Sequence, residues 1–449
     1  MLPNPYTPGR VPRRFVGREA ELLRVRREMA PVVAFGEMLG GPLLLSGPRG
    51  VGKTSLLLEV RRWAESQGFV VAHTSGVKHQ PFLGDVLDRV SVAVQGIGPT
   101  SPRRRRVDEL GASVGMSLAS ASVKMTWEDA DAGRAHPATS PALVSPVEDL
   151  LHQCAVLVRE GGGAGLLLLI DELHEPLGSV EHDRYLPNPV AVRDAAVLLN
   201  ALQNLDNDRS ENPLGLIAAG LPETGSHLMR AATFAERTNE IRISELDPTT
   251  ARAVLTVPAH ELGVRWEDTA LDVAVGIADG YPQALQVAGK WTWDAAEPDD
   301  GDTLCLADIQ AAGPEIARHL DTMYERRWAT ATPTEREFLT AIASLEVDDP
   351  DRRVRRAHIA AQLGRTTSSI GPVRESALSK GIVEDAGHGY LRFTLPGFGP
   401  WLRANDEDAT PGPVLGPSDN AAQTRLQASR REQRQQLPRG PSPGGSPQR

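Results

Sequence analysis

Cysteine and aromatic residues are scarce in this chain of 449 residues, which contains two Cys and only 4% Phe, Trp and Tyr. The two cysteines, Cys154 and Cys305, cannot build a disulfide framework, which is typical of proteins from a reducing compartment. Long apolar runs are also missing, since residues 166–170 form one of the longest and are far too few to span a bilayer. The Pro- and Arg-rich N-terminus has no apolar segment like that of a signal peptide. We therefore expect a cytoplasmic protein without a membrane partner.

An excess of positive charge is absent as well. The formal net charge is -10 at pH 7, so no overall field draws the whole molecule to nucleic acid. A hydrophobic content of 40% is sufficient to bury real cores, and the length suggests about three domains.

A glycine-rich loop lies early in the chain. It follows the pattern G-x-x-x-x-G-K-[ST] with Gly47, Pro48, Arg49, Gly50, Val51, Gly52, Lys53 and Thr54. Residues 43–45 before it predict a short buried strand, and a helix is expected from Ser55 to position 66. In such a loop, backbone N–H groups and the helix N-terminus face phosphates, Lys53 reaches the β- and γ-phosphates, and the Thr54 hydroxyl binds Mg²⁺. The sequence therefore predicts that residues 47–55 bind ATP with Mg²⁺.

Two carboxylates, Asp171 and Glu172, follow the apolar run 166–170. Such a run suits a strand that is buried on both faces of a parallel sheet, and ligands bind at the carboxyl ends of these strands. Asp171 is predicted to hold Mg²⁺ and Glu172 to act as the general base that polarises the attacking water. The alternative is a helix whose acidic first turn favours its dipole.

Further elements of the first half follow from apolar periodicity. They are predicted strands at 69–74, 214–219 and 241–243, and predicted helices at 81–94, 146–160, 192–205 and 226–236. Residues 96–145, rich in Gly, Ala, Ser and Pro, predict an irregular insertion with a small hairpin near 114–125. The arginine run 103–106 within it is expected to be a solvated loop or a contact for nucleic acid or an acidic partner.

The loop and the carboxylates resemble the Walker A and Walker B motifs of AAA+ and STAND-type ATPases. The stretch Phe15-Val16-Gly17-Arg18-Glu19 resembles the entry segment of that family, although an ordinary helix N-terminus remains the alternative. The resemblance implies an α/β fold, an αβα sandwich with a parallel sheet of strand order 5-1-4-3-2. It also implies that Phe15 and Val16 contact the adenine base.

The same resemblance divides the chain into consecutive parts. They are an extended segment at 1–12, a P-loop ATPase core at 13–245, an α-helical lid at 246–328, a winged helix at 329–403 and a disordered tail at 404–449.

Two further residues are singled out by their place in the family pattern. The motif Gly280-Tyr281-Pro282 resembles the G-x-P motif, which implies that Pro282 lies against the nucleotide, although a plain helix start explains it too. Arg237 occupies the family's place for an arginine finger, which implies self-association through the core, with a surface salt bridge as the alternative. The usual sensor residues are missing, and Thr224 is the nearest polar candidate, which leaves the rate of hydrolysis open.

Three helical patterns and two strand patterns within 334–395 resemble the C-terminal winged helix of origin-recognition-type ATPases. If this unit binds duplex DNA, its third helix enters the major groove with Arg365, Arg374 and Lys380 at hand. Gly371 and Pro372 disturb that helix, and basic and acidic residues are nearly balanced over 329–403. A winged helix that contacts proteins is therefore equally open.

The sequence thus predicts a Mg²⁺-dependent ATPase that acts as a nucleotide-driven switch and associates with DNA. The alternative is a STAND-like signalling or scaffold protein whose winged helix binds protein and which turns over little ATP. Binding to duplex DNA that weakens with salt would separate the two classes.

Overall fold

The computed structural model of the protein describes residues 2–78, 80–98, 101–128, 141–181, 184–348 and 352–405. Residues 129–140 of the predicted insertion and residues 406–449 of the predicted tail lie outside this set. Within the described ranges, no helix has the length and apolar character needed to cross a bilayer. Cys154 and Cys305 are both free thiols.

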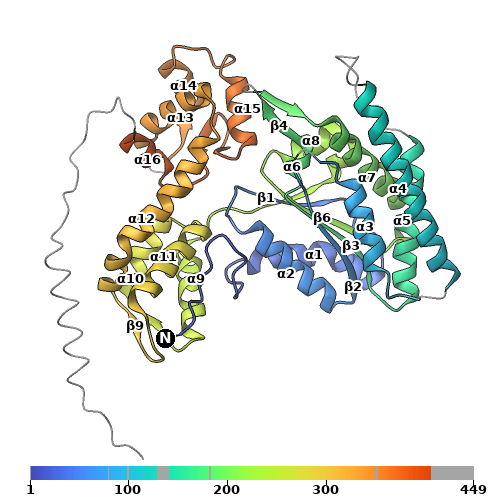
Figure 1. Cartoon of the computed structure of the whole chain (residues 1–449), viewed down its shortest axis with the longest axis horizontal. Helices are drawn as coiled ribbons and strands as arrows, with labels where there is room; N and C mark the ends of the chain where they lie inside the picture. The colour runs from blue at the N-terminus through green and yellow to red at the C-terminus, as the bar shows by residue number, and fades with distance from the viewer. Residues whose placement is uncertain are drawn as a thin grey trace, which may run out of the picture. The chain divides into compact units, whose positions relative to one another are not determined.

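A parallel sheet of five strands organises the first half of the chain (Figure 1). Its strands lie side by side in the order β2-β3-β6-β1-β7, and every pair is parallel. Counted along the chain, this is the order 5-1-4-3-2, so the predicted topology is confirmed. The strands are β1 (Leu43–Ser46), β2 (Phe69–Ser75), β3 (Gly165–Asp171), β6 (Leu214–Gly220) and β7 (Asn239–Arg242).

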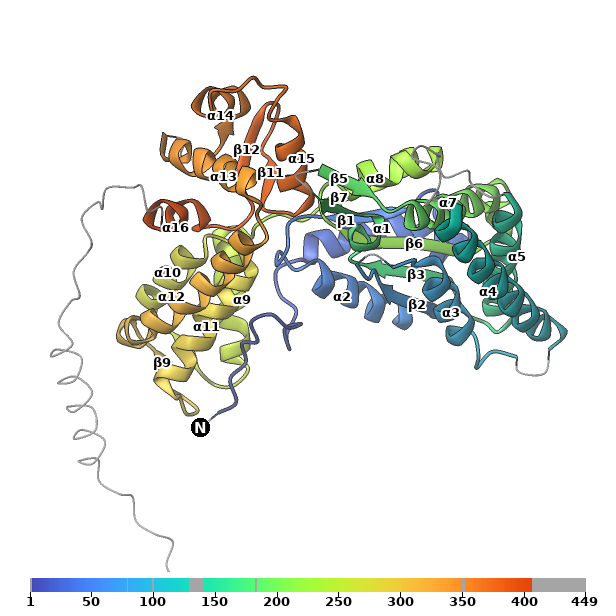
Figure 2. The same ribbon diagram turned by 45° about the horizontal axis from the view of Figure 1, so that its top comes forward.

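Helices cover both faces of the sheet, because alternate side chains of the strands point to opposite sides. Leu43 and Leu45 pack with one helix layer, whereas Leu44 packs with the other. The first layer holds α1 (Glu19–Phe35) and α2 (Lys53–Ser66). The second holds α3 (Leu83–Ala93), α4 (Pro102–Glu128), α5 (Pro141–Glu160) and α7 (Pro189–Asn207), as Figure 2 shows from another side. The result is the predicted αβα sandwich.

The predicted irregular insertion at 96–145 is wrong over most of its described part, where α4 forms one long helix and no hairpin. Its buried side chains Val107, Val114 and Leu118 are spaced by seven and four residues, which is a helical period. Gly111 and Gly115 lower the intrinsic helix propensity, so packing against α3 and α5 stabilises this helix more than its composition does. The arginine run belongs to its first turns, where Arg104 is buried and paired with Asp108 at 2.6 Å.

Short elements follow the carboxyl ends of β3 and β6. After β3 come α6 (His174–Leu177) and the hairpin strands β4 (Gly178–Glu181) and β5 (Arg184–Pro187), which the sequence did not predict. The single helix predicted at 226–236 is divided into α8 (Thr224–Ala231) and a 3₁₀ helix at Thr233–Arg237.

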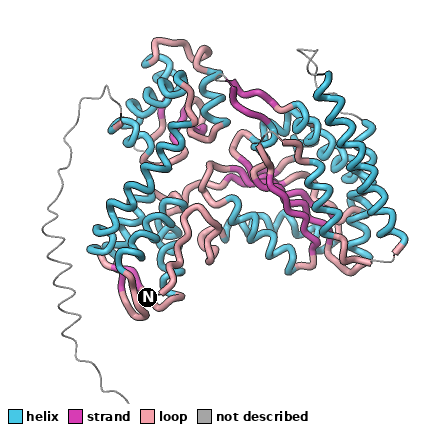
Figure 3. The backbone as a smooth tube through the Cα atoms, in the orientation of Figure 1, coloured by secondary structure: helices cyan, strands magenta, loops and turns pink. Residues whose placement is uncertain are grey.

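A helical region follows the sheet. It comprises α9 (Pro248–His260), α10 (Asp268–Ala278), α11 (Pro282–Ala296) and α12 (Leu306–Ala329), with the short strands β8 (Arg265–Trp266) and β9 (Thr303–Leu304). Residues 2–12 form neither helix nor strand and pack on this region (Figure 3). Tyr6 is buried there, and its hydroxyl donates to the carbonyl of Leu255 at 2.5 Å.

The last described unit has the order helix, strand, helix, helix, strand, strand, helix. Its three strands form an antiparallel sheet in the order β10-β12-β11. The elements are α13 (Pro333–Leu345), β10 (Val354–Arg355), α14 (Arg356–Gln362), α15 (Gly371–Ser379), β11 (Val383–Asp385), β12 (Tyr390–Phe393) and α16 (Phe398–Ala404). The helix predicted at 367–379 begins later, at Gly371, so that Pro372 occupies the first turn, where its missing N–H costs nothing.

Candidate nucleotide site

Three segments that are far apart in the sequence line a cavity of about 650 Å³. Residues 50–55 of the glycine-rich loop form one wall, the N-terminal segment around Phe15 and Val16 forms another, and Pro282 at the start of α11 forms a third. Glu172 lines the same cavity. The structure therefore brings together some of the predicted site residues from four separate stretches, whereas Gly47, Pro48, Arg49 and Asp171 do not line this cavity.

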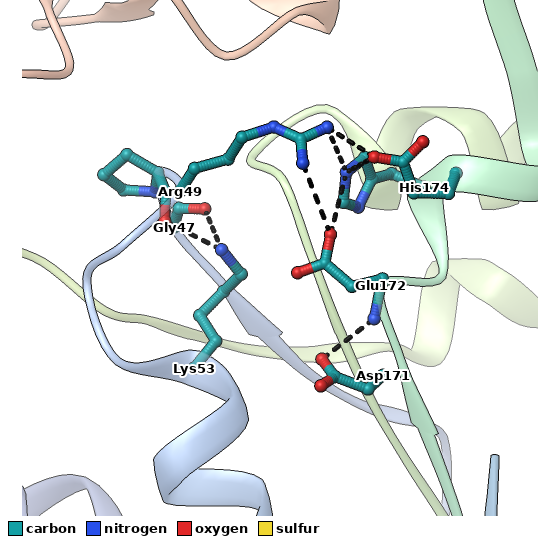
Figure 4. A network of polar contacts seen from close by, with 8 residues as sticks. Gly47, Arg49, Lys53, Asp171, Glu172 and His174 are labelled. Carbon is teal, nitrogen blue, oxygen red and sulfur yellow. Dashed lines mark hydrogen bonds and ion pairs between the residues drawn. The ribbon is translucent and has the colours of Figure 1, made fainter. Parts of the chain in front are cut away.

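The glycine-rich loop connects β1 to α2 and holds Lys53 in its interior. Only 4% of Lys53 is exposed, and its Nζ donates to the carbonyl oxygens of Gly47 and Pro48, each at 2.8 Å (Figure 4). Burial lowers the pKa of Lys53 to about 8, because removal from water disfavours the charged amine. A buried ammonium in this position interacts strongly with a polyphosphate, since little water screens the charge.

Position 50 of the loop requires glycine, because the G-x-P motif packs against it and leaves no space for a Cβ. Its φ is +79°, and a Cβ at this position would meet the Tyr281 hydroxyl at 2.2 Å and Gln283 Oε1 at 2.5 Å. Tyr281 is buried and donates its hydroxyl to the carbonyl oxygen of Arg49. The motif thus contacts the loop through Tyr281, while the adjacent Pro282 lines the cavity.

The two carboxylates lie at the carboxyl end of β3, on the opposite side of β6 from the loop. Asp171 is buried, and its Oδ1 accepts a hydrogen bond from the Glu172 backbone N–H at 2.9 Å. Glu172 has a φ of 49°, a left-handed conformation that is uncommon for this residue type. The Thr54 hydroxyl and the Asp171 carboxylate supply hard oxygen donors, which suit Mg²⁺.

Arg49 joins the loop to the residues after β3. Its Nη1 lies 3.7 Å from Glu172 Oε2, and its Nη2 lies 2.5 Å from Glu175 Oε1. A hydrogen bond from His174, and then Arg49, lower the pKa of Glu175 to about 2. The ligand atoms of Glu172, His174 and Glu175 lie within 4.8 Å of one another, as in some metal sites, but the Arg49 guanidinium already supplies positive charge to them (Figure 4).

Two functional candidates were missed in the sequence. Arg18 is buried and donates to the carbonyl oxygens of Val51 at 3.0 Å and Ser244 at 2.6 Å, so it connects the entry segment to the loop. Arg18 lies within the segment Phe15-Val16-Gly17-Arg18-Glu19, so the entry motif could have indicated that it has a role at the site. Arg327 of α12 lies near Tyr281, and burial lowers its pKa. No motif marks Arg327, because only the packing of α12 brings it to the loop.

Arg237 is not brought to this cavity. It lies just before β7, where Asn239 pairs with Leu43 at the start of β1, whereas the glycine-rich loop follows the end of β1. Its side chain is 57% exposed, and Nη1 lies 2.7 Å from Asp206 Oδ2. A residue at this end of the sheet can complete a nucleotide site only in another molecule. Thr224, which follows β6, is fully buried and lines a neighbouring cavity.

Comparisons with known proteins agree with this geometry. Residues 14–217 match the family model of the AAA ATPase domain, and residues 321–402 match a domain of unknown function (DUF8462). No match was found among curated proteins.

Two solved structures are similar over most of their length. One is the Walker-type ATPase paby2304 of Pyrococcus abyssi, with a TM-score of 0.52, 15% identity, and coverage of 87% of this chain and 96% of that chain. The other is the ORC2 protein of Aeropyrum pernix in ADPNP–ADP complexes, with a TM-score of 0.51, 16% identity, and coverage of 88% and 96%. At such identities the likeness concerns the fold. The domain match shows an AAA ATPase domain over residues 14–217, and the chain shares the fold of these two structures.

Proposed function

We propose that the protein is a Mg²⁺-dependent ATP hydrolase that acts as a nucleotide-driven switch. The observation that carries the proposal is the single cavity lined by Lys53, Thr54, Glu172 and Pro282. These residues come from the loop, the carboxyl end of β3 and the start of α11, so they combine a phosphate-binding group with a candidate base. ATP turnover measured together with molecular mass in each nucleotide state tests the proposal.

The chain's own residues have separate roles in this reaction. Lys53 would exchange its two backbone carbonyl partners for the β- and γ-phosphate oxygens. Glu172 would accept a proton from the attacking water, provided that Arg49 releases its carboxylate or orients it. Thr54 and Asp171 would hold Mg²⁺, which when bound neutralises charge that develops on the phosphates. Phe15 and Val16 would contact the base.

The switch follows from contacts between the loop and the helical region. Within the proposed parts, 13–245 is the core, 246–328 the lid and 329–403 a winged helix. Tyr281 and Arg327 from the lid lie at the loop, so a bound γ-phosphate would change the balance of these contacts.

The winged helix has two candidate partners, duplex DNA and another protein. Cations predicted to serve a recognition helix are engaged within the chain: Arg365 with Glu337 at 3.0 Å, Arg374 with Asp385 at 2.6 Å and Lys380 with Glu335 at 2.5 Å. This pairing favours a protein contact for α15. Arg355, which donates to the Tyr390 hydroxyl at 2.7 Å, is the better candidate for DNA phosphate.

If DNA is the partner, we expect its affinity to fall with salt and to depend on Arg355 more than on Arg374. Arg355→Ala should reduce the slope of log K against log salt by about 1, as expected for one lost phosphate contact. Arg374→Ala is the matched control, because Asp385 already neutralises that side chain. Duplex titrations at several salt concentrations measure this, and the absence of salt-dependent binding supports the protein partner.

If core-to-core self-association completes the site, specific activity should rise with protein concentration. Arg237→Ala should then bind ATP normally but turn it over on the order of 10³-fold more slowly, because a finger stabilises transition-state charge. Mixing Arg237→Ala with Glu172→Gln should restore part of the activity. Arg230→Ala, on the nearby helix α8, is a control with an exposed Arg. A flat concentration profile with wild-type activity of Arg237→Ala would show that the protein works as a monomer.

A further inference from the structure

A second cavity, of about 860 Å³, lies beside the glycine-rich loop and is separate from the one described above. Arg49 lines this second cavity and Glu172 lines the first, while Gln283 lines both. Its other walls come from the segments after β3 and β6, from the end of α12 and from the end of α15. We refer to it as the basic chamber, because Lys78, Arg326 and Arg327 line it.

Three cations of the basic chamber have no acidic partner within the part of the chain that the structure describes. Lys78, Arg326 and Arg327 line it, and none of them forms an ion pair with a carboxylate of the described residues. The acidic lining offsets them only in part, because Glu175 is already paired with Arg49. Burial raises the pKa of Glu223, the other carboxyl group, to about 7, which reduces its negative charge near neutral pH. The chamber therefore presents an excess of positive charge to any occupant.

Some residues that line this chamber have buried polar atoms without a hydrogen-bond partner among the described residues. Such atoms cost free energy when they stay unpaired, so an occupant that supplies a partner would be stabilised by them. Thr224 is fully buried, yet its hydroxyl has no partner among the described residues. The atoms of this kind in chamber-lining residues include Thr224 Oγ1, Ser379 Oγ and His174 Nδ1.

The lining also indicates the chemistry of the occupant. Among the described residues no Phe, Tyr or Trp lines the basic chamber, so a large aromatic ring for stacking a nucleobase is missing there. Its volume is within the range of small-molecule sites, about 300–1,000 Å³, and exceeds what a single phosphate ion needs. Hydroxyl and imidazole groups together with unpaired cations suit a polar molecule that carries more than one phosphate charge.

We propose that the basic chamber binds a small, multiply charged phosphate compound in addition to ATP, and that this ligand controls hydrolysis through Arg49. The control step rests on the proposed ATPase function, because it requires Glu172 as the base. Phosphate oxygens in the chamber compete with Glu172 and Glu175 for the Arg49 guanidinium. Release of Glu172 from Arg49 removes the guanidinium charge from its Oε2, which leaves His174 Nε2 at 3.3 Å as a neighbour and makes the carboxylate a better acceptor for a proton from water. The ligand thus activates turnover.

Calorimetry on the full chain tests the binding site with inorganic pyrophosphate as the probe. The protein is first titrated with a non-hydrolysable ATP analogue and Mg²⁺ until the glycine-rich loop is saturated. Pyrophosphate should then bind with a stoichiometry near one. The Lys78→Ala/Arg326→Ala double variant should bind it at least about 10-fold more weakly, because two charge-assisted contacts to the phosphate oxygens are lost.

A matched double variant controls for the change in net charge. Arg265→Ala/Arg318→Ala also removes two cations, from surface positions that do not line the chamber, and its affinity for pyrophosphate should equal that of the wild type. Equal binding by both double variants would overturn the proposal, as would no binding to the analogue-saturated protein. Binding of inorganic phosphate to ADP-saturated protein, without any binding of pyrophosphate, would assign the chamber to the reaction product and also overturn it.

The titrations distinguish a failure of the proposed ATPase function from a failure of the chamber proposal. If the first titration shows no binding of the ATP analogue, the proposed ATPase function fails, whereas pyrophosphate affinity in the two double variants still tests the chamber. If the analogue binds and pyrophosphate does not, only the chamber proposal fails. Stimulation of ATP turnover by pyrophosphate in the wild type, with none in Lys78→Ala/Arg326→Ala, would support the control step through Arg49. Lack of stimulation in the wild type would refute that step.

Discussion

Lys53→Ala is expected to weaken ATP binding by roughly 100-fold or more, the effect of removing one partner from a buried charge contact. Lys53 is the cation inside the glycine-rich loop, where its Nζ donates to the carbonyl oxygens of Gly47 and Pro48. The other cation of the loop, Arg49, is directed to Glu172 and Glu175 and does not replace it. Calorimetric titration with ATP and Mg²⁺ measures the loss.

A surface lysine provides the control for this substitution. Lys290→Ala removes an amine that pairs with Asp294 on α11, and its ATP affinity should match that of the wild type. Because Lys53 also satisfies two backbone carbonyls, thermal unfolding of Lys53→Ala must show that the fold is retained. A folded variant with unchanged affinity would contradict the assignment of residues 47–54 as the phosphate-binding loop.

Glu172→Gln is expected to bind ATP normally and to hydrolyse it about 10²–10⁴-fold more slowly, the usual contribution of a general base. The amide has nearly the shape of the carboxylate but cannot accept a proton from water. Glu172 lines the nucleotide cavity and lies at the carboxyl end of the buried strand β3, so its side chain faces the reacting region. Single-turnover hydrolysis and equilibrium binding, measured on the same preparation, separate the two effects.

Glu175→Gln is the matched control, because Glu175 shares Arg49 with Glu172 but does not line the nucleotide cavity. If loss of an ion pair with Arg49 were the cause of slow turnover, both variants would be slow. Asp171→Asn should instead weaken Mg²⁺-dependent binding, since a neutral amide is a poorer ligand for this cation. Wild-type turnover in Glu172→Gln and Asp171→Asn would assign both carboxylates a structural role only.

Local sequence was sufficient for the five strands of the parallel sheet and for several helices beside it. The apolar run that became β3 has residues on both faces of the sheet, and such strands read as continuous hydrophobic segments. The loop at 47–54 and the carboxylates 171–172 also have local signatures, because chain geometry around a phosphate requires Gly, Lys and Thr at fixed spacing. The strand order came from the family resemblance and not from these patterns, and the structure agrees with it.

Prediction from local sequence failed where tertiary packing outweighs the intrinsic helix propensity of the residues. The glycines of α4 predict no helix, yet Val107, Val114 and Leu118 bury one face of it against α3 and α5. The alternation of apolar residues around 114–118 has the period of a strand, and nothing within that short stretch reveals the partner that selects the helix. Such selection depends on apolar area buried against other elements, which only the folded chain provides.

The sequence by itself indicated a glycine-rich loop with the pattern of a phosphate-binding loop after one strand, and two acidic residues after another, buried strand. Only the tertiary structure decided what surrounds them: Arg18 on the loop backbone, Arg49 between the two cavities, and Arg327 beside Tyr281. The reason is that hydrogen bonds and ion pairs act over a few ångströms, between residues separated by tens to hundreds of positions in the chain. Side chains that carry no motif acquire a role when folding places them within that distance.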